Sequence, residues 1–328
     1  MTARAFARKL LDKALRRLGQ GQIGEPGRFN PSLLPEGAES RLRVDHPRLV
    51  ELKRRYSSFD SRVTCPLVWK SGYVGPQDLL YFRGDNAYLW QLRGLNMDPA
   101  GYALATQYVK SIDRLGLLDK LVEDDYFGNF VFQIGGKTIS RDLLDSILEI
   151  YFLDRHLGLA SVENHRAILD VGAGYGRLAH RLLSALSGAQ RYLCTDAVAE
   201  STFISEYYLG FRGLDGRARA VPLDEIESAL AAERADLAIN IHSFSECQPS
   251  AIDWWVSLLA RHRVKHLMIV PNQLEHGGTL LLTNQRDDMR AIFERHGYRE
   301  IAKEPKYRDP LVQRHAVNPT WHFLFELR

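Results

Sequence analysis

The chain has few cysteines, no long apolar run and almost no excess charge of one sign. Its 328 residues include only Cys65, Cys194 and Cys247, which stand far apart and form no C-x-x-C pair. This odd, scattered set indicates neither a disulfide framework nor a zinc site, and it is typical of a reducing compartment, so we predict a cytoplasmic protein. No apolar run approaches the roughly 18 residues of a membrane-spanning helix.

The charge balance argues against a nucleic-acid partner. The 43 basic side chains exceed the 40 acidic ones by only three. Binding driven by phosphate neutralisation needs a basic patch or stripe, and the sequence shows neither that nor a recognised RNA-binding module. Composition therefore favours a globular protein that acts on a small molecule, with a homo-oligomer left open.

The first 139 residues are predicted to be mainly helical. Residues 3–18 place apolar side chains on one stripe with Arg and Lys around it, which predicts a basic amphipathic helix. Docking on its own domain is the favoured role, and peripheral contact with an anionic membrane surface or a partner, or a transit peptide, are the alternatives. Further expected elements are a linker over 19–39, helices over 45–56 and 98–115, and a hairpin over 129–138.

From residue 167 onward the pattern changes to regular alternation of strands and helices. Such alternation predicts a mainly parallel sheet that is covered by helices on both faces. The last two strands have no room for a crossover helix between them, so we expect that pair to be antiparallel. The expected helices are 140–156, 178–186, 199–209, 253–263 and 286–296, and the expected strands are 167–171, 190–195, 217–222, 235–241, 265–270, 298–304 and 320–327.

The most informative segment is a strand that ends at Asp170 and Val171 and runs into three alternating glycines. Glycine is needed where a turn requires positive φ and where backbone must approach a ligand closely. A dinucleotide fingerprint that began at Gly172 would need its third glycine at position 177, which is Arg177. The loop therefore predicts a cofactor other than a dinucleotide, and its candidate contacts are Asp170, Gly172, Ala173, Gly174, Tyr175 and Gly176.

Further cofactor contacts are expected where the next strands end, because ligands of open α/β sheets bind beyond the carboxyl ends of the strands. Asp196 ends the second strand, 20 residues after Gly176, and can accept both hydroxyls of a ribose. A helix N-cap is the alternative role for this carboxylate. The weaker candidates are Ala197, Leu223, Asp224 and Asn240, of which Asp224 is equally suited to capping the next helix.

The fourth strand is followed by a polar segment at the expected catalytic rim. His242 is the candidate general base, because an unperturbed histidine pKa of about 6.5 suits removal of a hydroxyl proton, and a structural histidine is the alternative. If this turn is helical, Glu246 can orient the imidazole, and His276 is the reserve base. Glu246, Glu275 and His276 have no recognised metal-ligand spacing, so we predict no metal.

Taken together, several segments resemble a bacterial family of sugar O-methyltransferases, within the class I methyltransferases that depend on S-adenosylmethionine (SAM). The resemblance covers about residues 120–328. It implies SAM as the cofactor and a glycosyl hydroxyl as the acceptor. The resembling segments are the glycine loop with its flanks over 169–179, the Asn-His-Ser segment over 240–246, Pro271 with Asn272, and the tail segments over 305–310 and 321–325.

We therefore predict an α/β protein with a Rossmann-like seven-stranded methyltransferase sheet, with helices on both faces and a mainly helical N-terminal extension. Residues 140–328 would bind SAM, and residues 1–139 would supply an acceptor-binding cap. The expected reaction is methyl transfer to a hydroxyl of a sugar or glycoside, and the alternatives are an NAD(P)-dependent sugar oxidoreductase or epimerase, a non-catalytic binding protein and an RNA methyltransferase. The expected substrate contacts are Asp125, Tyr126, Ser243, Asn272, Tyr307 and His322.

Overall fold

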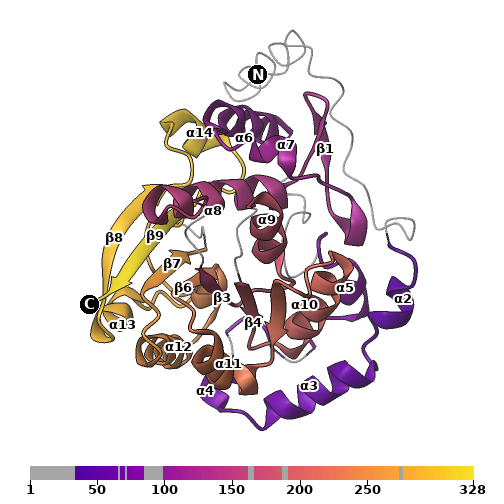
Figure 1. Ribbon diagram of the computed structural model, residues 1–328, viewed down its shortest axis with the longest axis vertical. Coiled ribbons are helices and arrows are strands. Elements are labelled where there is room, and N and C mark those ends of the chain that lie inside the picture. The colour runs from indigo at the N-terminus through magenta and orange to yellow at the C-terminus, as the bar shows by residue number, and fades with distance from the viewer. Residues whose placement is uncertain are drawn as a thin grey trace.

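The computed structural model in Figure 1 describes residues 34–65, 67–70, 72–84, 99–161, 166–186, 191–272 and 276–328. The predicted helix over 3–18, most of the predicted linker and Glu275 lie outside the described residues. Within the described part of the chain, none of the helices has the length and apolar character that crossing a membrane requires.

A seven-stranded sheet forms the centre of the molecule, in the order β5-β4-β3-β6-β7-β9-β8. The five strands from β5 to β7 in this order are parallel, and β9 runs antiparallel to both β7 and β8. The predicted α/β, Rossmann-like sheet and its antiparallel last pair are therefore confirmed. The strands are β3 (Ala167–Val171), β4 (Arg191–Thr195), β5 (Ala218–Val221), β6 (Leu237–Ile241), β7 (His266–Val270), β8 (Tyr298–Pro305) and β9 (Trp321–Leu327), and a separate hairpin joins β1 (Phe132–Ile134) to β2 (Lys137–Ile139).

Each of the seven helices predicted with bounds in the described part of the chain begins and ends within four residues of those bounds, and several shorter helices were not predicted. In the longest of them, the Ser140 hydroxyl accepts the Leu143 N–H at 3.0 Å, and Gly158 ends the helix in the left-handed region. The helices are α2 (Ala38–Arg41), α3 (Pro47–Ser57), α4 (Ser61–Thr64), α5 (Pro76–Leu80), α6 (Pro99–Ile112), α7 (Leu117–Lys120), α8 (Arg141–Leu157), α9 (Arg177–Ala185), α10 (Ala199–Phe211), α11 (Ile226–Glu233), α12 (Pro249–Arg261), α13 (Arg290–Arg295) and α14 (Pro310–His315). Three short 3₁₀ turns are η2 (Tyr126–Gly128), η3 (Leu223–Glu225) and η4 (Ser243–Glu246).

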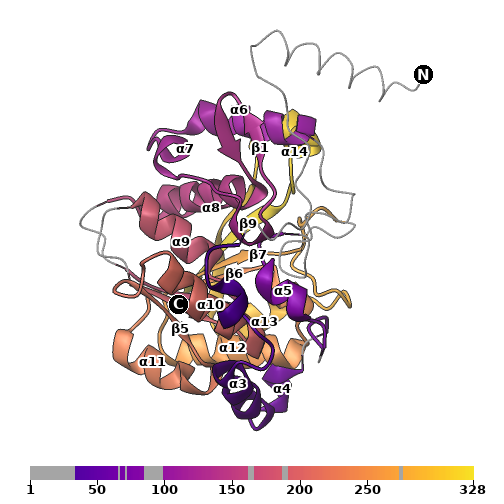
Figure 2. The same cartoon turned by 90° about the vertical axis from the view of Figure 1, so that its right-hand side faces the viewer.

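Two apolar cores lie on the two faces of the sheet, because successive side chains of a strand point in opposite directions. In β3, Leu169 and Val171 join one core with α10, α11 and α12, whereas Ile168 joins the other with α6, α8 and α9. Figure 2 shows these two groups of helices on opposite sides of the strands. The predicted cover of helices on both faces is confirmed.

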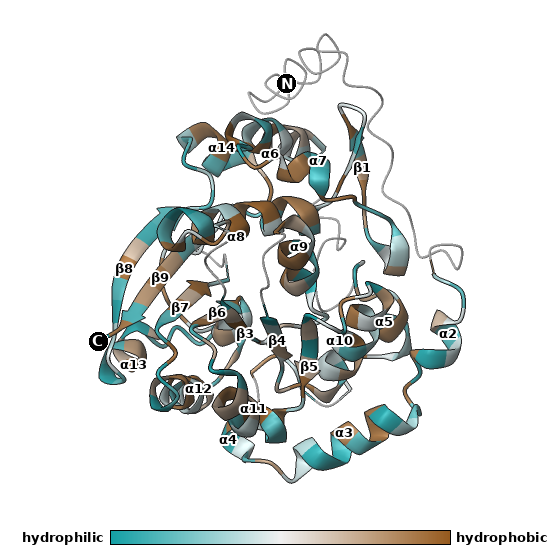
Figure 3. Ribbon diagram, in the orientation of Figure 1, coloured by the Kyte–Doolittle hydropathy of each residue, from teal (hydrophilic) through white to brown (hydrophobic). Residues whose placement is uncertain are grey.

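The N-terminal elements pack on both of these faces. Helix α3 packs against α10, and it alternates hydrophilic and hydrophobic residues along its length, as Figure 3 shows. Its Leu49 and Leu52 are fully buried, while Arg48 pairs with Glu206 of α10 at 2.6 Å. Helix α6 packs instead against α8 and α14 at the opposite end of the molecule (Figure 1).

Candidate functional site

A cavity of about 570 Å³ lies where β3, β4 and β6 end. The glycine loop forms part of its wall. Other parts come from segments that are distant in sequence, including Trp69 of the N-terminal region and Asn318 before β9. The predicted site residues that line this cavity are Asp170, Gly172, Ala173, Gly174, Tyr175, Asp196, Ala197, His242, Ser243, Glu246 and Asn272.

The glycine loop adopts backbone conformations that favour glycine. Gly172, Gly174 and Gly176 have φ values of 74°, 57° and 85°. A Cβ on Gly172 would also lie 2.0 Å from the Oγ atom of Ser243. The N–H groups of Gly172 and Ala173 donate to the Thr195 carbonyl at 2.9 and 3.1 Å, which fixes the loop against the end of β4.

Asn240 holds the glycine loop in place through hydrogen bonds and does not line the cavity. Its Nδ2 donates to the Val171 carbonyl at 2.8 Å and to Ser243 Oγ at 2.5 Å, and its Oδ1 accepts the Phe244 N–H at 3.0 Å. The side chain is 1% exposed. The prediction that Asn240 contacts the cofactor is therefore corrected, because its amide is used to join the ends of β3 and β6.

Three carboxylates line the cavity beside the loop, those of the buried Asp170 and Asp196 and of the half-buried Glu246. Asp196 accepts the N–H groups of Gly174 at 3.1 Å and Val198 at 2.9 Å, and Asp170 accepts the Tyr192 hydroxyl at 2.9 Å. Burial raises the pKa of Asp170 and of Asp196 to about 7, and it also raises the pKa of Glu246. Among the described residues, none of these three carboxylates forms a salt bridge.

Glu246 is held by residues other than the predicted one. Its carboxylate accepts Trp69 Nε1–H at 2.5 Å and Asn272 Nδ2–H at 3.1 Å, and its carbonyl accepts the Leu67 N–H at 2.8 Å. The predicted pairing with His242 is wrong, because the turn is the 3₁₀ segment η4 rather than an α-helix. The sequence does not indicate that Trp69 belongs to this site, because the segment around it shows no hydrophobic periodicity that would predict its position.

His242 lies at the cavity wall with an uncommon backbone conformation, φ 68° and ψ −35°. For a residue with a Cβ such a conformation is strained, and strain of this kind persists where the surroundings hold it in place. Here the His242 N–H donates to the Val270 carbonyl at 2.7 Å. Burial, and then the charge of Arg141, lower the pKa of His242 to about 3, so the imidazole is neutral near pH 7. Its role as a general base stays a prediction.

A group of polar residues that the sequence did not single out lies close to His242. The Asp145 carboxylate accepts Arg141 Nε–H at 3.2 Å and Asn318 Nδ2–H at 3.0 Å, and it pairs with Lys306. Arg141, Asp145 and Asn318 line the cavity. The sequence places Arg141 and Asp145 on one face of a predicted helix. Lys306, which precedes α14, and Asn318, which follows it, come close to them only through the fold.

The predicted adenine contacts lie outside the cavity. Asp224 is bound by the Arg55 guanidinium, with Nε and Nη2 contacts of 2.8 and 2.6 Å. Leu223 is fully buried, and its N–H donates to the Tyr56 hydroxyl at 2.9 Å. These residues join β5 to α3, so the structure corrects their assignment to the cofactor.

Four predicted substrate residues and one predicted base are likewise away from the cavity. Asp125 and Tyr126 are exposed at the start of η2. Tyr307 is fully buried and donates to the Val317 carbonyl at 2.7 Å, and His322 is buried against the Phe152 ring. The reserve base His276 accepts the Leu280 N–H at 3.4 Å in a turn that does not line the cavity. Within the described part of the chain, no three His, Cys, Asp or Glu side chains are grouped to hold a metal ion.

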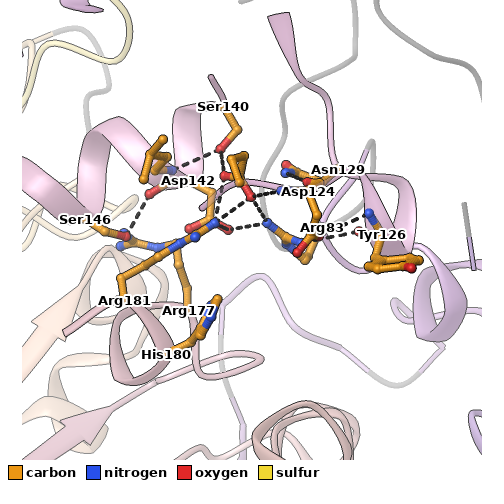
Figure 4. Close-up of polar contacts among 12 residues, drawn as sticks. Arg83, Asp124, Tyr126, Asn129, Ser140, Asp142, Ser146, Arg177, His180 and Arg181 are labelled. Atoms are coloured by element: carbon orange, nitrogen blue, oxygen red, sulfur yellow. Dashed lines mark hydrogen bonds and ion pairs between the residues drawn. The ribbon is translucent and has the colours of Figure 1, made fainter. Parts of the chain in front are cut away.

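A buried cluster of ion pairs connects the glycine loop to the N-terminal region (Figure 4). The fully buried Arg83 contacts Glu123 at 2.7 Å, Asp124 at 2.6 Å and Asp142 at 3.1 Å. Asp142 also accepts the Tyr175 hydroxyl at 2.9 Å. Arg181 and Arg212 complete this Arg83 cluster by pairing with Glu123 and Asp124. Glu123 and Asp124, which directly precede the predicted substrate contacts Asp125 and Tyr126, are therefore bound by arginines of this cluster.

Neither a family model nor a curated protein matches the chain. Among solved structures, StiE O-MT is similar at 12% identity and a TM-score of 0.38, over 55% of this chain and 73% of that one. The [4+2]-cyclase SpnF is similar at 14% identity and a TM-score of 0.41, over 69% and 94%. Magnesium protoporphyrin IX methyltransferase ChlM from Synechocystis PCC 6803, in a structure with bound SAM, is similar at 12% identity and a TM-score of 0.38, over 58% and 85%. Similarity at this level does not indicate which substrate this chain binds.

Proposed function

We propose that this protein is a SAM-dependent O-methyltransferase that acts on a hydroxyl of a sugar or glycoside. The observation that carries the proposal is the set of three carboxylates beside the glycine loop, the buried Asp170 and Asp196 and the half-buried Glu246. Among the described residues none of them forms a salt bridge, and the charge of Arg177 acts on Asp170 from a distance. A buried carboxylate without a counter-ion favours a ligand that brings positive charge.

SAM has the charges that this set of carboxylates requires. It carries a sulfonium and an ammonium group and no phosphate, whereas a nicotinamide dinucleotide brings a pyrophosphate that these carboxylates would repel. Arg177 gives no compensation for a pyrophosphate, because both Nη atoms bind the Glu149 carboxylate, at 2.8 and 2.9 Å. The charges therefore favour SAM over NAD(P).

Different residues of the cavity suit the amino-acid, ribose and adenine portions of SAM. The glycine loop lets the backbone approach the amino-acid portion closely. The Asp196 carboxylate accepts the Gly174 and Val198 N–H groups and a hydrogen bond from Ser201, and its remaining lone-pair capacity can accept a ribose hydroxyl. Trp69, Val198 and Trp255 supply apolar surface for the adenine.

Bound SAM supplies an electrophilic methyl group and leaves as S-adenosylhomocysteine (SAH). The chain must hold the acceptor hydroxyl in line, exclude water and accept one proton. His242 is neutral and lies in the cavity wall, so its ring is placed to take that proton, but burial that lowers its pKa to about 3 makes it a weaker base than a free imidazole. General-base assistance typically contributes about 10² to 10⁴ in rate. Trp69 and the segment that contains it close one side of the cavity through the contact with Glu246. The sugar acceptor is supported by the resemblance of the Asn-His-Ser segment.

Calorimetric titration with SAM, SAH and NAD tests the proposal, with Asp196→Asn and Asp224→Asn as a matched pair. We expect SAM and SAH to bind and NAD not to bind. D196N should weaken SAH binding about 10- to 100-fold, because it removes a charged hydrogen-bond acceptor. D224N, the same change at a carboxylate that Arg55 binds outside the cavity, should leave the affinity unchanged. Absence of SAH binding, or tighter binding of NAD, would reject the proposal, and mass spectrometry of glycosides after incubation with SAM tests the acceptor.

A further inference from the structure

The three carboxylates beside the glycine loop have different surroundings. Burial raises the pKa of Asp170, near the end of β3, and the charge of Arg177 acts in the opposite direction. Asp196 follows β4 and accepts backbone N–H groups and a hydrogen bond from Ser201. Glu246 comes from a third place, the end of η4, which follows β6. The order β4-β3-β6 therefore places the three carboxylates at the carboxyl ends of three neighbouring strands.

The Glu246 carboxylate is fixed in the cavity by neutral groups. One of its oxygens accepts Trp69 Nε1–H at 2.5 Å, and the other accepts Asn272 Nδ2–H at 3.1 Å. Within the described part of the chain, no cationic side chain pairs with this carboxylate. The two oxygens offer about four lone-pair sites, so these two hydrogen bonds leave capacity for a ligand. The side chain is therefore held in place while its negative charge is not balanced by a direct partner.

The turn that carries Glu246 is packed on the glycine loop. At the start of η4, the Ser243 hydroxyl donates to the Val171 carbonyl at 3.3 Å, and its Oγ atom lies 2.0 Å from where a Cβ of Gly172 would be. Burial raises the pKa of Asp196, and the charge of Glu246 adds to this rise, so the two carboxylates act on each other across the cavity. Glu246 therefore lies close to both the glycine loop and Asp196.

The sulfur atom of SAM joins its amino-acid portion to its ribose. With those portions at the glycine loop and at Asp196, the sulfonium would come within range of the Glu246 charge. We propose that Glu246 attracts the sulfonium electrostatically, so that the cavity binds SAM more tightly than SAH. This inference rests on the proposed function and adds to it the residue that distinguishes the methyl donor from its product.

Methyl transfer removes the charge that Glu246 attracts. Transfer to the acceptor hydroxyl breaks the sulfur–methyl bond, forms the oxygen–methyl bond, leaves the electron pair on sulfur and passes the hydroxyl proton to His242. The sulfur of SAH is neutral, so Glu246 again lacks a cationic partner. Since a charge removed from water is costly without a partner, the loss of the sulfonium favours release of SAH.

Calorimetric titration with SAM, SAH and sinefungin tests the inference, at pH 8, above the pKa of about 7 of Asp170 and Asp196. Sinefungin carries a protonated amine where SAM has its sulfonium, and it has no methyl group to transfer. We expect both charged ligands to bind the wild type at least about tenfold more tightly than SAH, because opposite charges attract strongly in a partly desolvated cavity. Glu246→Gln should reduce this ratio to less than about threefold, because it removes the charge and keeps the size of the side chain.

Two further variants separate charge from structure. Glu225→Gln is the matched control, the same change at a glutamate that pairs with Arg55 at 2.6 Å outside the cavity, and it should leave all three affinities unchanged. Trp69→Phe removes a neutral donor from Glu246 and leaves its charge. It should therefore change the affinities for SAM and SAH by the same factor.

SAH that binds the wild type as tightly as SAM, or a preference for SAM that E246Q retains, would overturn the inference. A preference that W69F abolishes would also overturn it, because the indole ring would then be the group that distinguishes SAM from SAH. A wild-type protein that binds none of the three ligands would instead reject the proposed function itself.

Discussion

At Gly172, backbone conformation and packing both exclude a side chain. Its φ of 74° lies in the left-handed region, and the Oγ atom of Ser243 occupies the place of a Cβ. Gly136, in the turn between β1 and β2, has nearly the same φ of 75° but no atom within 4 Å of the corresponding position. A comparison of alanine substitutions at the two glycines therefore separates the free-energy cost of a positive φ from the cost of steric overlap between a Cβ and its neighbours.

We expect Gly172→Ala to destabilise the protein by about 2–5 kcal/mol and Gly136→Ala by about 1–2 kcal/mol. The smaller value is the cost of positive φ for an L-residue, and the difference is the cost of moving Ser243 and the end of β6. Urea denaturation of both variants measures this. Equal losses of stability would show that the loop accommodates the methyl group.

Asp196 gives the stability of the ligand-free protein a pH dependence. Its folded-state pKa of about 7 is above the ordinary value of 3.8, so between about pH 4 and pH 7 the folded state holds a proton that the unfolded state has released. The free energy of unfolding therefore falls as pH rises through this window, by up to about 1.4 kcal/mol per pH unit.

Urea denaturation of the wild type and of D196N at pH 5, 6 and 7 measures this contribution. An asparagine does not titrate, so the wild type should lose more stability than D196N as the pH rises. Parallel profiles for the two proteins would mean that Asp196 is already ionised in the folded state at pH 5.

At the scale of elements, α8 and α9 are joined to the N-terminal region by charge as well as by apolar packing. The Arg83 cluster draws its residues from the segment after α5, the segment before η2, the first turn of α8, α9 and the end of α10. Because the Tyr175 hydroxyl donates to Asp142 of this cluster, the ion pairs also support the glycine loop.

Arg83→Met should lower the free energy of unfolding by about 3–5 kcal/mol, because it leaves buried carboxylates without one of their counter-ions. Arg43→Met is the control, since Arg43 pairs with Asp45 at a site where both side chains are more than half exposed. This change should cost less than about 1 kcal/mol. A loss for R83M as small as that for R43M would show that Arg181 and Arg212 balance the cluster without Arg83.

At the scale of the whole molecule, the two apolar cores share the strands of one sheet. Helix α3 belongs to the core of α10 and α12, and α6 belongs to the core of α8 and α9. Neither N-terminal helix has a core separate from the sheet. The N-terminal region should therefore lose its structure together with the sheet.

Calorimetry should show one unfolding transition for the chain. SAH at 100 times its dissociation constant should stabilise the folded state by about 2.7 kcal/mol and shift that transition upward as a whole. A separate transition at lower temperature, unaffected by SAH, would instead mean that residues before α8 form an independent unit.

The strands and the glycine loop could be predicted from the sequence, because these features depend on residues that are close together in the chain. Apolar runs separated by helical periodicity predict the sheet, and the spacing of Gly172, Gly174 and Gly176 predicts the loop. Asp196 could be placed for the same reason, since a strand ends directly before it. These contacts and turns are largely local, so periodicity and spacing are sufficient to reveal them.

Only the tertiary structure decided which polar side chains share the cavity. Trp69 reaches Glu246 across 177 residues, and Lys306 reaches Asp145 across 161. The tertiary structure also determines that Asn240 joins the ends of β3 and β6 by hydrogen bonds and that Asp224 pairs with Arg55. A polar side chain takes its role from its hydrogen-bonding or charged partner, and when that partner is distant in sequence, no local pattern can identify it.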